Sequence, residues 1–479
     1  MELVSCDVCV VGSGIAGLCA ATAAVEAGAS VTLVCQGALC SGSSFAGTTW
    51  GLGMVGPRSD SDADVQAFVD AVQDPGEHRA ADAYVRALGR GFHGALERFR
   101  AMGAVIEDVE PAHREDRAYV PCFGTAVQDW HGFHALRSVK PLREQLCKVK
   151  VQVIDHCEAL SLLSDPASGA VSGILGFTGG GTSATIVAAG ATVLATGGAA
   201  ASLSPTLASP LAKGTGLVLA TDEGATCGNL GYGQVMCGIV TKGRPAVFNE
   251  KVWGLTTLLK DGRDVFELAG VSPSLAREAL EAHSWHGPYS RKRVSHVVEE
   301  SIAAVGGSCE AVVARPQGEV QPFVATYMDW LEKTHGFTWN APMPVALFHQ
   351  ASNGGLRCDA SGWTRVPGLY AAGEVAPVFA VDRLGGIASS TAMVFGLGAG
   401  ESAAAWAEDH GSGVRRADSS QGGRGLLFHG PDGSPRPVDA VREMSSNELG
   451  ALRDAMGSRV RQRAHELVRM AMDEAKSPF

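Results

Sequence analysis

An apolar run followed by a short glycine pattern opens the chain, and this combination limits the possible folds more than any other feature. Residues 8–11 read Val-Cys-Val-Val and lead directly into GSGIAG at 12–17, after which an alanine-rich stretch continues to Ala27. A buried strand, G-x-G-x-x-G and a helix form the first half of a βαβ unit that binds a dinucleotide. The apolar run at 29–34, after Gly28, supplies the second strand.

The three glycines of this pattern have different physical tasks. Gly12 allows the tight turn, Gly14 lets the backbone approach a pyrophosphate, and Gly17 lets the helix pack closely on the strand. The free N–H groups and the dipole at the helix N-terminus, around Ser13 and Ala16, favour the negative charge of that pyrophosphate. An ordinary glycine-rich strand–turn–helix is the alternative, and the flanking strands favour the dinucleotide interpretation.

Length and charge narrow the class of protein. A chain of 479 residues can hold two or three domains, and 19% charged residues with abundant Gly is typical of α/β enzymes built around a cofactor. The net charge of −11 argues against binding nucleic acid or an anionic membrane surface. Residues 8–25 carry no charge, but their glycines follow the dinucleotide pattern and no basic segment precedes them. We therefore expect no membrane span and no signal peptide, and a cytoplasmic protein.

The cysteines and histidines do not predict a metal site. The twelve cysteines are scattered from Cys6 to Cys358, so we expect reduced core residues rather than disulfides or ligands. Cys6 and Cys9 form a C-x-x-C within the first strand, where positions three apart are expected on opposite faces. His131 and His134 lack further ligands nearby in the sequence.

Changes in composition along the chain predict how it is divided. Residues 1–231 form the first part of a dinucleotide-binding domain, and the more charged, tryptophan-containing segment 232–345 is expected to be an inserted domain. The first domain resumes over 346–407 with a glycine-rich helix, and 408–479 are expected to be a loose linker and a C-terminal helix. The predicted class is α/β: a doubly wound, Rossmann-like domain with an inserted α+β domain and a helical tail.

Three separated segments together resemble one flavoprotein family. GSGIAG at 12–17, ATGG at 195–198 and the stretch GLYAAGEV…DRLGGIASSTAMVFG at 368–396 are similar to the family of fumarate reductase, succinate dehydrogenase and L-aspartate oxidase. The resemblance covers most of residues 5–405 and implies FAD as cofactor, a doubly wound FAD domain and a mobile capping domain over the flavin. Covalent members of this family carry a histidine in the segment equivalent to 43–51, which has none here, so FAD is expected to be held non-covalently.

The resemblance and the residues together give a set of expected cofactor contacts. Gln36 stands where a carboxylate usually ends the second strand to hold the ribose, and Glu374 is placed to accept from hydroxyl groups. A solvated loop acid is the alternative for Glu374. A helix beginning near Gly386 would direct its N-terminus at the flavin edge that becomes negative on reduction. The full expected set is Gly12, Ser13, Gly14, Ala16, Gly17, Gln36, Ser43, Ser44, Ala159, Thr196, Gly197, Gly198, Glu374, Ala388 and Ser389.

The expected catalytic residues come from the same resemblance. Arg291 lies where the family's capping-domain arginine delivers or removes a proton, with Arg293 as a rival and a solvated basic helix start as the alternative. Arg383, in DRLGG, matches a second arginine whose planar guanidinium suits a carboxylate. The family's substrate histidine falls at Gln350, with His349 one residue away.

Several family features are missing around this expected substrate pocket. Residues 234–240 read QVMCGIV in place of the family's Phe-His-Pro-Thr segment, and residues 119–123 lack the glutamate of aspartate oxidase. The family's serine after the arginine falls at Ala388, beside Ser389. Losing hydrogen-bonded charge contacts costs about 2–5 kcal/mol each, so a dicarboxylate should bind poorly.

The prediction is therefore an FAD-dependent oxidoreductase that moves a hydride between the flavin and a carbon beside a carboxylate-type group of a small organic acid, by desaturation or double-bond reduction. The alternatives are L-aspartate oxidase and a non-catalytic flavin-binding or electron-transfer subunit. No haem or iron–sulfur motif supplies an internal electron relay, so dioxygen, a diffusible donor or a partner protein must exchange electrons with the flavin.

Overall fold

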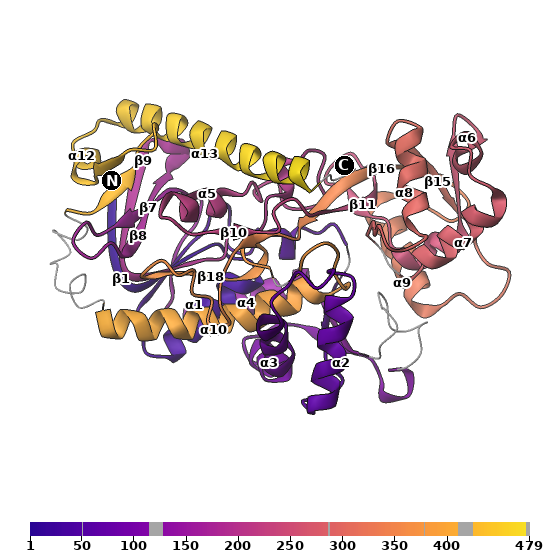
Figure 1. Cartoon of the computed structure of the whole chain (residues 1–479), viewed down its shortest axis with the longest axis horizontal. Coiled ribbons are helices and arrows are strands. Elements are labelled where there is room, and N and C mark those ends of the chain that lie inside the picture. The colour runs from indigo at the N-terminus through magenta and orange to yellow at the C-terminus, as the bar shows by residue number, and fades with distance from the viewer. Residues whose placement is uncertain (50, 115–127, 286–287, 378, 411–424, 476–479) are drawn as a thin grey trace.

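A large mixed sheet organises the fold in the computed structural model, which describes residues 1–49, 51–114, 128–285, 288–377, 379–410 and 425–475 (Figure 1). Its order is β20-β19-β7-β8-β9-β1-β2-β6, with β18 also paired to β9. The pairs β1–β2, β1–β9, β2–β6 and β9–β18 are parallel. The strands are β1 (Glu2–Val11), β2 (Val31–Val34), β6 (Gln152–Ile154), β7 (Glu158–Ser164), β8 (Val171–Thr178), β9 (Ser183–Leu194), β18 (Leu369–Ala371), β19 (Leu427–His429) and β20 (Pro435–Pro437).

Helices cover both faces of this sheet (Figure 1). One face packs against α1 (Ile15–Glu26) and α10 (Ile387–His410), with α3 (Asp82–Ala101) packed on α10, and the other against α5 (Thr215–Asp222) and α13 (Ser446–Glu474). Two glycines of α10 explain its close packing on α1. A Cβ on Gly396 would lie 2.6 Å from the carbonyl oxygen of Ala16, and one on Gly400 would lie 2.2 Å from that of Ala20. Only glycine permits this approach between the two backbones.

Cys6 and Cys9 are core residues of β1. The backbone N–H groups of Asp7 and Val8, which lie between them, both donate to the carbonyl oxygen of Ser30, at 3.0 Å each. Both cysteines are buried and belong to the same apolar cluster. Burial raises the pKa of the Cys6 thiol to about 11, so it behaves as a core residue.

A second sheet and its helices form the right-hand part of the molecule in Figure 1, which we call the β11–β16 unit (residues 233–352). The order is β12-β11-β16-β15-β13-β14, with all pairs antiparallel. Its apolar core contains Phe248, Trp253 and Tyr327. The elements are β11 (Gly233–Ile239), β12 (Ala246–Val247), β13 (Thr256–Lys260), β14 (Arg263–Asp264), β15 (Ser308–Val313), β16 (Pro342–Ser352), α6 (Val265–Leu268), α7 (Pro273–His283), α8 (His296–Ala304) and α9 (Pro322–His335).

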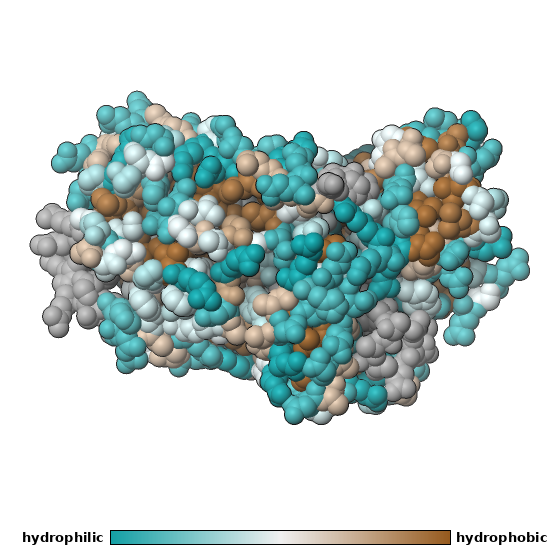
Figure 2. All heavy atoms as spheres, viewed as in Figure 1, coloured by the Kyte–Doolittle hydropathy of each residue, from teal (hydrophilic) through white to brown (hydrophobic). Residues whose placement is uncertain are grey.

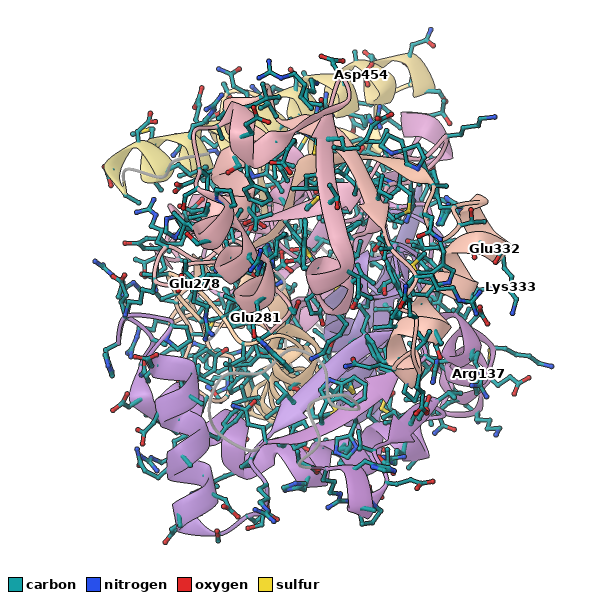
Figure 3. The ribbon with its side chains drawn as sticks, turned by 90° about the vertical axis from the view of Figure 1, so that its right-hand side faces the viewer. Arg137, Glu278, Glu281, Glu332, Lys333 and Asp454 are labelled. Atoms are coloured by element: carbon teal, nitrogen blue, oxygen red, sulfur yellow. The ribbon has the colours of Figure 1, made fainter. Side chains whose placement is uncertain are left out.

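The exposed surface of this unit mixes polar and apolar side chains. Figure 3 shows Glu278 and Glu281 on α7, and Glu332 and Lys333 on α9, and all four are exposed. Apolar side chains also gather over the β11–β16 unit in the face drawn in Figure 2. In the described part of the chain, no helix combines the length and apolarity that a membrane crossing requires.

Smaller elements complete the fold. A three-stranded antiparallel sheet, β3-β5-β4, lies beside α3 and α10. The remaining elements with several residues are β3 (Leu52–Gly56), β4 (Ile106–Asp108), β5 (Asp129–Phe133), β10 (Cys227–Gly228), β17 (Gly355–Leu356), α2 (Asp62–Gln73), α4 (Ala135–Lys148) and α12 (Asp439–Arg442).

The structure shows elements that the sequence predictions did not specify. Residues 62–101 contain two helices, α2 and α3, separated by a segment containing Asp74, Pro75 and Gly76. The first half of β9 pairs with β8, and its last residues pair with β18. Two strands, β19 and β20, extend the main sheet within the segment expected to be a loose linker.

Candidate functional site

The glycine pattern turns between β1 and α1 as its spacing predicts. Gly12 has φ +111°, and a Cβ there would lie 2.2 Å from the carbonyl oxygen of Ala195. A Cβ on Gly17 would lie 1.7 Å from the carbonyl oxygen of Gly12, so Gly17 supports the turn and does not line the cavity. Gly14, directly before α1, has only Ser44 Oγ near its Cβ position, at 3.5 Å. The space beside Gly14 therefore stays open for a ligand.

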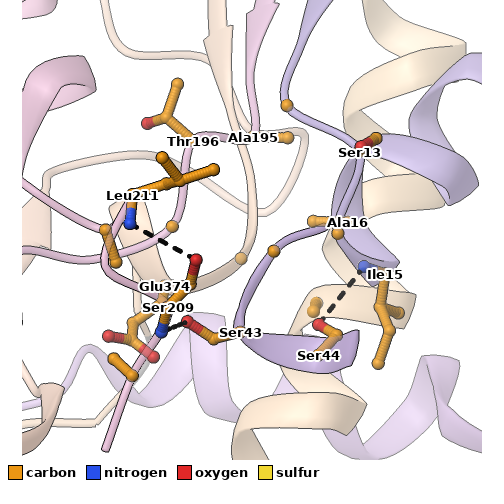
Figure 4. Close-up of a pocket in the computed structure, with 18 of the residues that line it drawn as sticks. Ser13, Ile15, Ala16, Ser43, Ser44, Ala195, Thr196, Ser209, Leu211 and Glu374 are labelled. Carbon is orange, nitrogen blue, oxygen red and sulfur yellow. Dashed lines mark hydrogen bonds between the residues drawn. The ribbon is translucent and has the colours of Figure 1, made fainter. Parts of the chain in front are cut away.

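An elongated cavity begins at this turn, and Figure 4 shows part of its wall. Most of the expected cofactor contacts line it: Gly12, Ser13, Gly14, Ala16, Gln36, Ser43, Ser44, Ala159, Thr196, Gly197, Glu374, Ala388 and Ser389. Gly198 does not, but a Cβ there would lie 2.1 Å from Glu374 Oε1, so this glycine makes room for the carboxylate.

Hydrogen bonds between loops hold the wall of this cavity. Ser44 Oγ accepts from the backbone N–H of Ile15 at 3.4 Å, and Ser43 Oγ accepts from that of Ser209 at 3.0 Å (Figure 4). Ser209 Oγ in turn accepts from the backbone N–H of Leu211 at 3.3 Å. Residues 207–212 were not expected at the site, because they lie in an irregular loop whose letters carry no recognisable pattern. The contribution of this loop to the cavity wall is evident from the hydrogen bond between Ser209 and Ser43.

A chain of polar contacts supports the end of the cavity at β2 and β7. Gln36 Nε2 donates to Glu158 Oε1 at 3.1 Å. The guanidinium of Arg453, on α13, donates to Glu158 Oε2 through Nε and Nη2 at 3.1 and 2.7 Å. Because its amide N–H is committed to Glu158, Gln36 keeps its carbonyl oxygen as an acceptor toward the cavity. The expected ribose position thus carries an amide that a partly buried ion pair orients.

A second cavity of about 680 Å³ adjoins the first on the side of the β11–β16 unit. Gln350, Arg383, Ala388 and Ser389 line both cavities, so the two spaces share a wall. The larger cavity is also lined by Gln234, Met236, Asn249 and Glu250 from the β11–β16 unit, and by Glu107, Asp108, Glu110, Trp130 and His134 from the small sheet and the segments beside it. A substrate in the larger cavity would contact a ligand in the first cavity along this wall.

Arg383 is the charged residue of the shared wall, and Glu374 lines the first cavity beside it. Arg383 is buried, at 8% exposed, and its guanidinium lies 5.0 Å from the centroid of the Phe379 ring. Burial lowers the pKa of Arg383, and the negative charges of Glu374 and Asp382 oppose this shift. Burial raises the pKa of Glu374, while Arg383 and the backbone N–H of Ser352, at 3.0 Å, stabilise its charged form. Arg383 Nη1 has no hydrogen-bond partner among the described residues, which leaves a cationic donor for a ligand.

Strand β16 separates the two residues expected at the substrate-histidine position. Gln350 faces the two cavities, whereas His349 lines a different, small cavity on the other side of the β11–β16 strand pair. Successive strand residues point to opposite faces, so they cannot share one role. Arg291 is exposed and lines this small cavity with His349. The structure therefore does not bring Arg291 together with Arg383, contrary to the expected arrangement.

The histidines and cysteines are arranged as structural residues. His131 contacts Asp108 Oδ1 at 2.5 Å and Asp129 Oδ2 at 2.9 Å, and His134 contacts Glu107 Oε2 at 2.7 Å. Within the described ranges, no group of three or more His, Cys, Asp or Glu side chains is placed to hold a metal ion. Residues 119–123, where the glutamate of aspartate oxidase was sought, lie outside the described residues.

Comparison with known proteins decides the family. A family model described as an FAD binding domain matches residues 7–389. The chain belongs to this FAD binding domain family. FAD is thus its cofactor, and the open space beside Gly14 and the polar groups of Glu374 fit such a ligand. Family membership places the chain among the FAD-dependent oxidoreductases.

Individual relatives are more distant. The chain is 28% identical to an L-aspartate oxidase of Streptomyces coelicolor, covering 78% of this chain and 63% of that protein. It is 26% identical to one of the subunits of the fumarate reductase (CoM/CoB) of Methanothermobacter marburgensis, covering 84% and 73%. The Mycobacterium smegmatis Sdh1 complex contains a chain with a similar fold, at a TM-score of 0.67 and 22% identity, covering 85% and 69%.

Proposed function

We propose that the protein moves a hydride between FAD and the carbon next to a carboxylate-type group of a small organic acid, either desaturating the acid or reducing its double bond. The observation that carries this proposal is Arg383, a buried arginine with an unpartnered Nη1 on the wall shared by the two cavities in the described part of the chain. FAD, when bound, supplies the acceptor or donor of the hydride. We expect it to be held non-covalently, since residues 43–51 contain no histidine.

Arg383 is suited to bind and orient the substrate. Its planar guanidinium can donate two parallel hydrogen bonds to a carboxylate, which fixes the direction of the neighbouring carbon. Holding that carbon in a reactive position removes much of the entropic barrier. The negative charges of Glu374 and Asp382 partly offset the cost of burying the charge of Arg383.

The β11–β16 unit is suited to exclude water from the shared wall, as the expected capping domain would. It contacts the FAD-binding part at several points: the backbone N–H of Val247 donates to the carbonyl oxygen of Thr48 at 2.9 Å, and Arg244 donates to that of Ala46 at 3.0 Å. Lys292 Nζ donates to the carbonyl oxygen of Asp74 at 3.1 Å. A dry site strengthens the contact between Arg383 and a carboxylate.

The proton that accompanies hydride transfer needs a separate carrier. Arg291 was the expected carrier, and its exposed position in a different cavity gives that role no geometric support. Besides Arg383, the titratable groups that line the proposed substrate space are Glu107, Asp108, Glu110, His113, His134 and Glu250. Exchange of electrons with a partner protein is part of the proposal, because some relatives are named as subunits or parts of complexes.

L-aspartate oxidase is a second candidate, because the Streptomyces coelicolor relative and several others carry that name at 26–29% identity. Gln350 argues against this candidate, because it places an amide where the family's substrate histidine is expected. A non-catalytic flavin-binding subunit is a third possibility, and retention of a buried Arg383 at the shared wall argues against it.

Anaerobic reduction of the flavin tests the proposal. The FAD-loaded protein is mixed with a panel of saturated acids, and the chemically reduced protein with enoates, while flavin absorbance is followed. We expect at least one acid to change the absorbance, and Arg383→Lys to lower kcat/KM by about 100-fold or more, because a lysine lacks the planar fork. Arg315→Lys, on an exposed residue, is the matched control. If no acid acts and Arg383→Lys changes nothing, the non-catalytic alternative gains support. Bleaching by aspartate with release of ammonia would favour the oxidase.

A further inference from the structure

Three residues that line the larger cavity each carry a buried polar atom without a hydrogen-bond partner among the described residues. Arg383 Nη1, Gln350 Oε1 and Gln234 Oε1 are buried and have no partner among the described residues. Arg383 and Gln350 line both cavities, and Gln234 lines the larger one. Buried polar groups are nearly always paired, so each of these atoms is available to a ligand.

Neighbouring contacts fix the orientation of the Gln234 amide. Gln234 is 1% exposed, and its Nε2 donates to Asp382 Oδ1 at 3.0 Å. The same carboxylate oxygen accepts from the backbone N–H of Arg383 at 2.9 Å. A flipped amide would place its oxygen against a carboxylate oxygen, so the nitrogen must face Asp382. The unpartnered atom of Gln234 is therefore a hydrogen-bond acceptor.

Strand pairing places the second amide beside the first. Gln234 pairs with Ala351 across β11 and β16, next to Gln350 in the chain. The pairing register shifts between Gln234 and Val235, so Gln350 is the extra residue of a bulge. Both glutamines therefore face the larger cavity, together with Met236.

We propose that the substrate carries one carboxylate, held by Arg383, and an uncharged hydrogen-bond donor such as a carboxamide or hydroxyl, held by the Gln234 carbonyl oxygen, and that the site rejects a second carboxylate. This inference rests on the proposed function and narrows its substrate class. A carboxylate has acceptor atoms only and cannot bond to an amide oxygen that is itself fixed as an acceptor. Glu107 and Glu110, which also line the larger cavity, add repulsion toward a second anion.

An isosteric pair of ligands tests the inference. Succinate and its monoamide, succinamate, differ in one carboxylate. Anaerobic calorimetry on the protein with chemically reduced FAD, which cannot oxidise a saturated acid, measures each Kd without turnover. We expect succinamate to bind at least about tenfold more tightly, because a buried site built for a donor discriminates against an analogue that lacks one. Gln234→Leu should reduce this preference to within about threefold by weakening succinamate binding. Gln66→Leu, on an exposed residue of α2, should keep the full preference.

The outcomes separate this inference from the proposed function. Equal or tighter binding of succinate overturns the inference, and so does an unchanged preference in Gln234→Leu. Failure of both ligands to bind overturns it as well, since Arg383 alone would then not hold a small acid. A protein that prefers succinamate but whose flavin no acid or enoate oxidises or reduces would support the inference about recognition and contradict the proposed reaction.

Discussion

Alanine substitutions at two glycines of the same motif should have different effects: Gly17→Ala should destabilise the fold, and Gly14→Ala should weaken FAD binding. Gly17 faces the backbone: its Cβ would lie 1.7 Å from the carbonyl oxygen of Gly12, far inside contact distance. That oxygen belongs to the tight turn, so no side-chain rotation can relieve the clash. Overpacking usually costs about 1–3 kcal/mol and more where the surroundings cannot move, so we expect Gly17→Ala to lower the free energy of unfolding by about 3 kcal/mol or more.

Gly14 faces the cavity and should behave differently. Its φ of −72° suits alanine, and the nearest atom to its Cβ, Ser44 Oγ, lies at an ordinary 3.5 Å. The FAD-free protein should therefore tolerate Gly14→Ala with a change below about 1 kcal/mol. The added methyl occupies space that the pyrophosphate needs, so we expect the Kd for FAD to rise about 100-fold, equivalent to about 2.7 kcal/mol.

Urea unfolding with and without excess FAD separates the two effects. FAD stabilises the folded protein in proportion to its affinity, so Gly14→Ala should lose most of the gain that FAD gives while its FAD-free stability stays near that of the parent. Gly17→Ala should be less stable under both conditions. The reasoning is refuted if Gly17→Ala matches the parent in stability, or if Gly14→Ala binds FAD with parental affinity.

Three further predictions concern other parts of the molecule. Glu158→Gln should weaken FAD binding about tenfold in a fluorescence titration, because Gln36 loses the charged acceptor that Arg453 holds in place. An unchanged Kd would show that the contacts among Gln36, Glu158 and Arg453 do not contribute to FAD binding. Hydrogen bonds to aspartates raise the pKa of His93 from 6.5 to about 9, so its stabilising contribution is complete below pH 6.5 and is lost as the pH rises through 9. Urea unfolding from pH 6 to 10 should show this loss, about 1–2 kcal/mol after allowance for solvent screening, and His93→Gln should abolish it; an identical pH profile in the variant would contradict the assignment. Arg291→Lys should keep kcat within about threefold of the parent, because Arg291 lines a different cavity from Arg383; a hundredfold loss would restore it as the proton carrier.

The FAD-binding half was predictable from the sequence because its constraints are local. The spacing of Gly12, Gly14 and Gly17 is set by one turn, and the strand before it and the helix after it follow directly in the chain. The match to an FAD binding domain over residues 7–389 confirms the cofactor that this spacing predicts. Strands β19 and β20 were missed, since β7, the strand through which β19 joins the main sheet, lies more than 250 residues away in the sequence.

The residues around the proposed substrate space were less predictable from the sequence, because the pairing register of the strands decides which face each side chain occupies. A sequence pattern can place His349 and Gln350 in one strand but cannot tell which of them faces the cavity when the partner strand is out of simple register. The shift between Gln234 and Val235 decides this, and it sets Gln350 beside Gln234.

Because Arg383 and Arg291 line cavities on different sides of the β11–β16 strand pair, they are not equally suited to bind the substrate. Strands β11 and β16 form a wall with Gln234 and Gln350 on one side and His349 and Arg291 on the other. On the first side, Arg383 is a buried cation whose Nη1 is left for a ligand. A buried charge without a ligand is costly, and nearby carboxylates offset that cost only in part, so an anion entering the larger cavity is drawn to Arg383. Arg291 is exposed and carries no such desolvation penalty. Under the proposed function, desolvation therefore favours Arg383 over Arg291 as the residue that holds the substrate carboxylate, and the amide oxygens of Gln234 and Gln350 restrict the rest of the substrate.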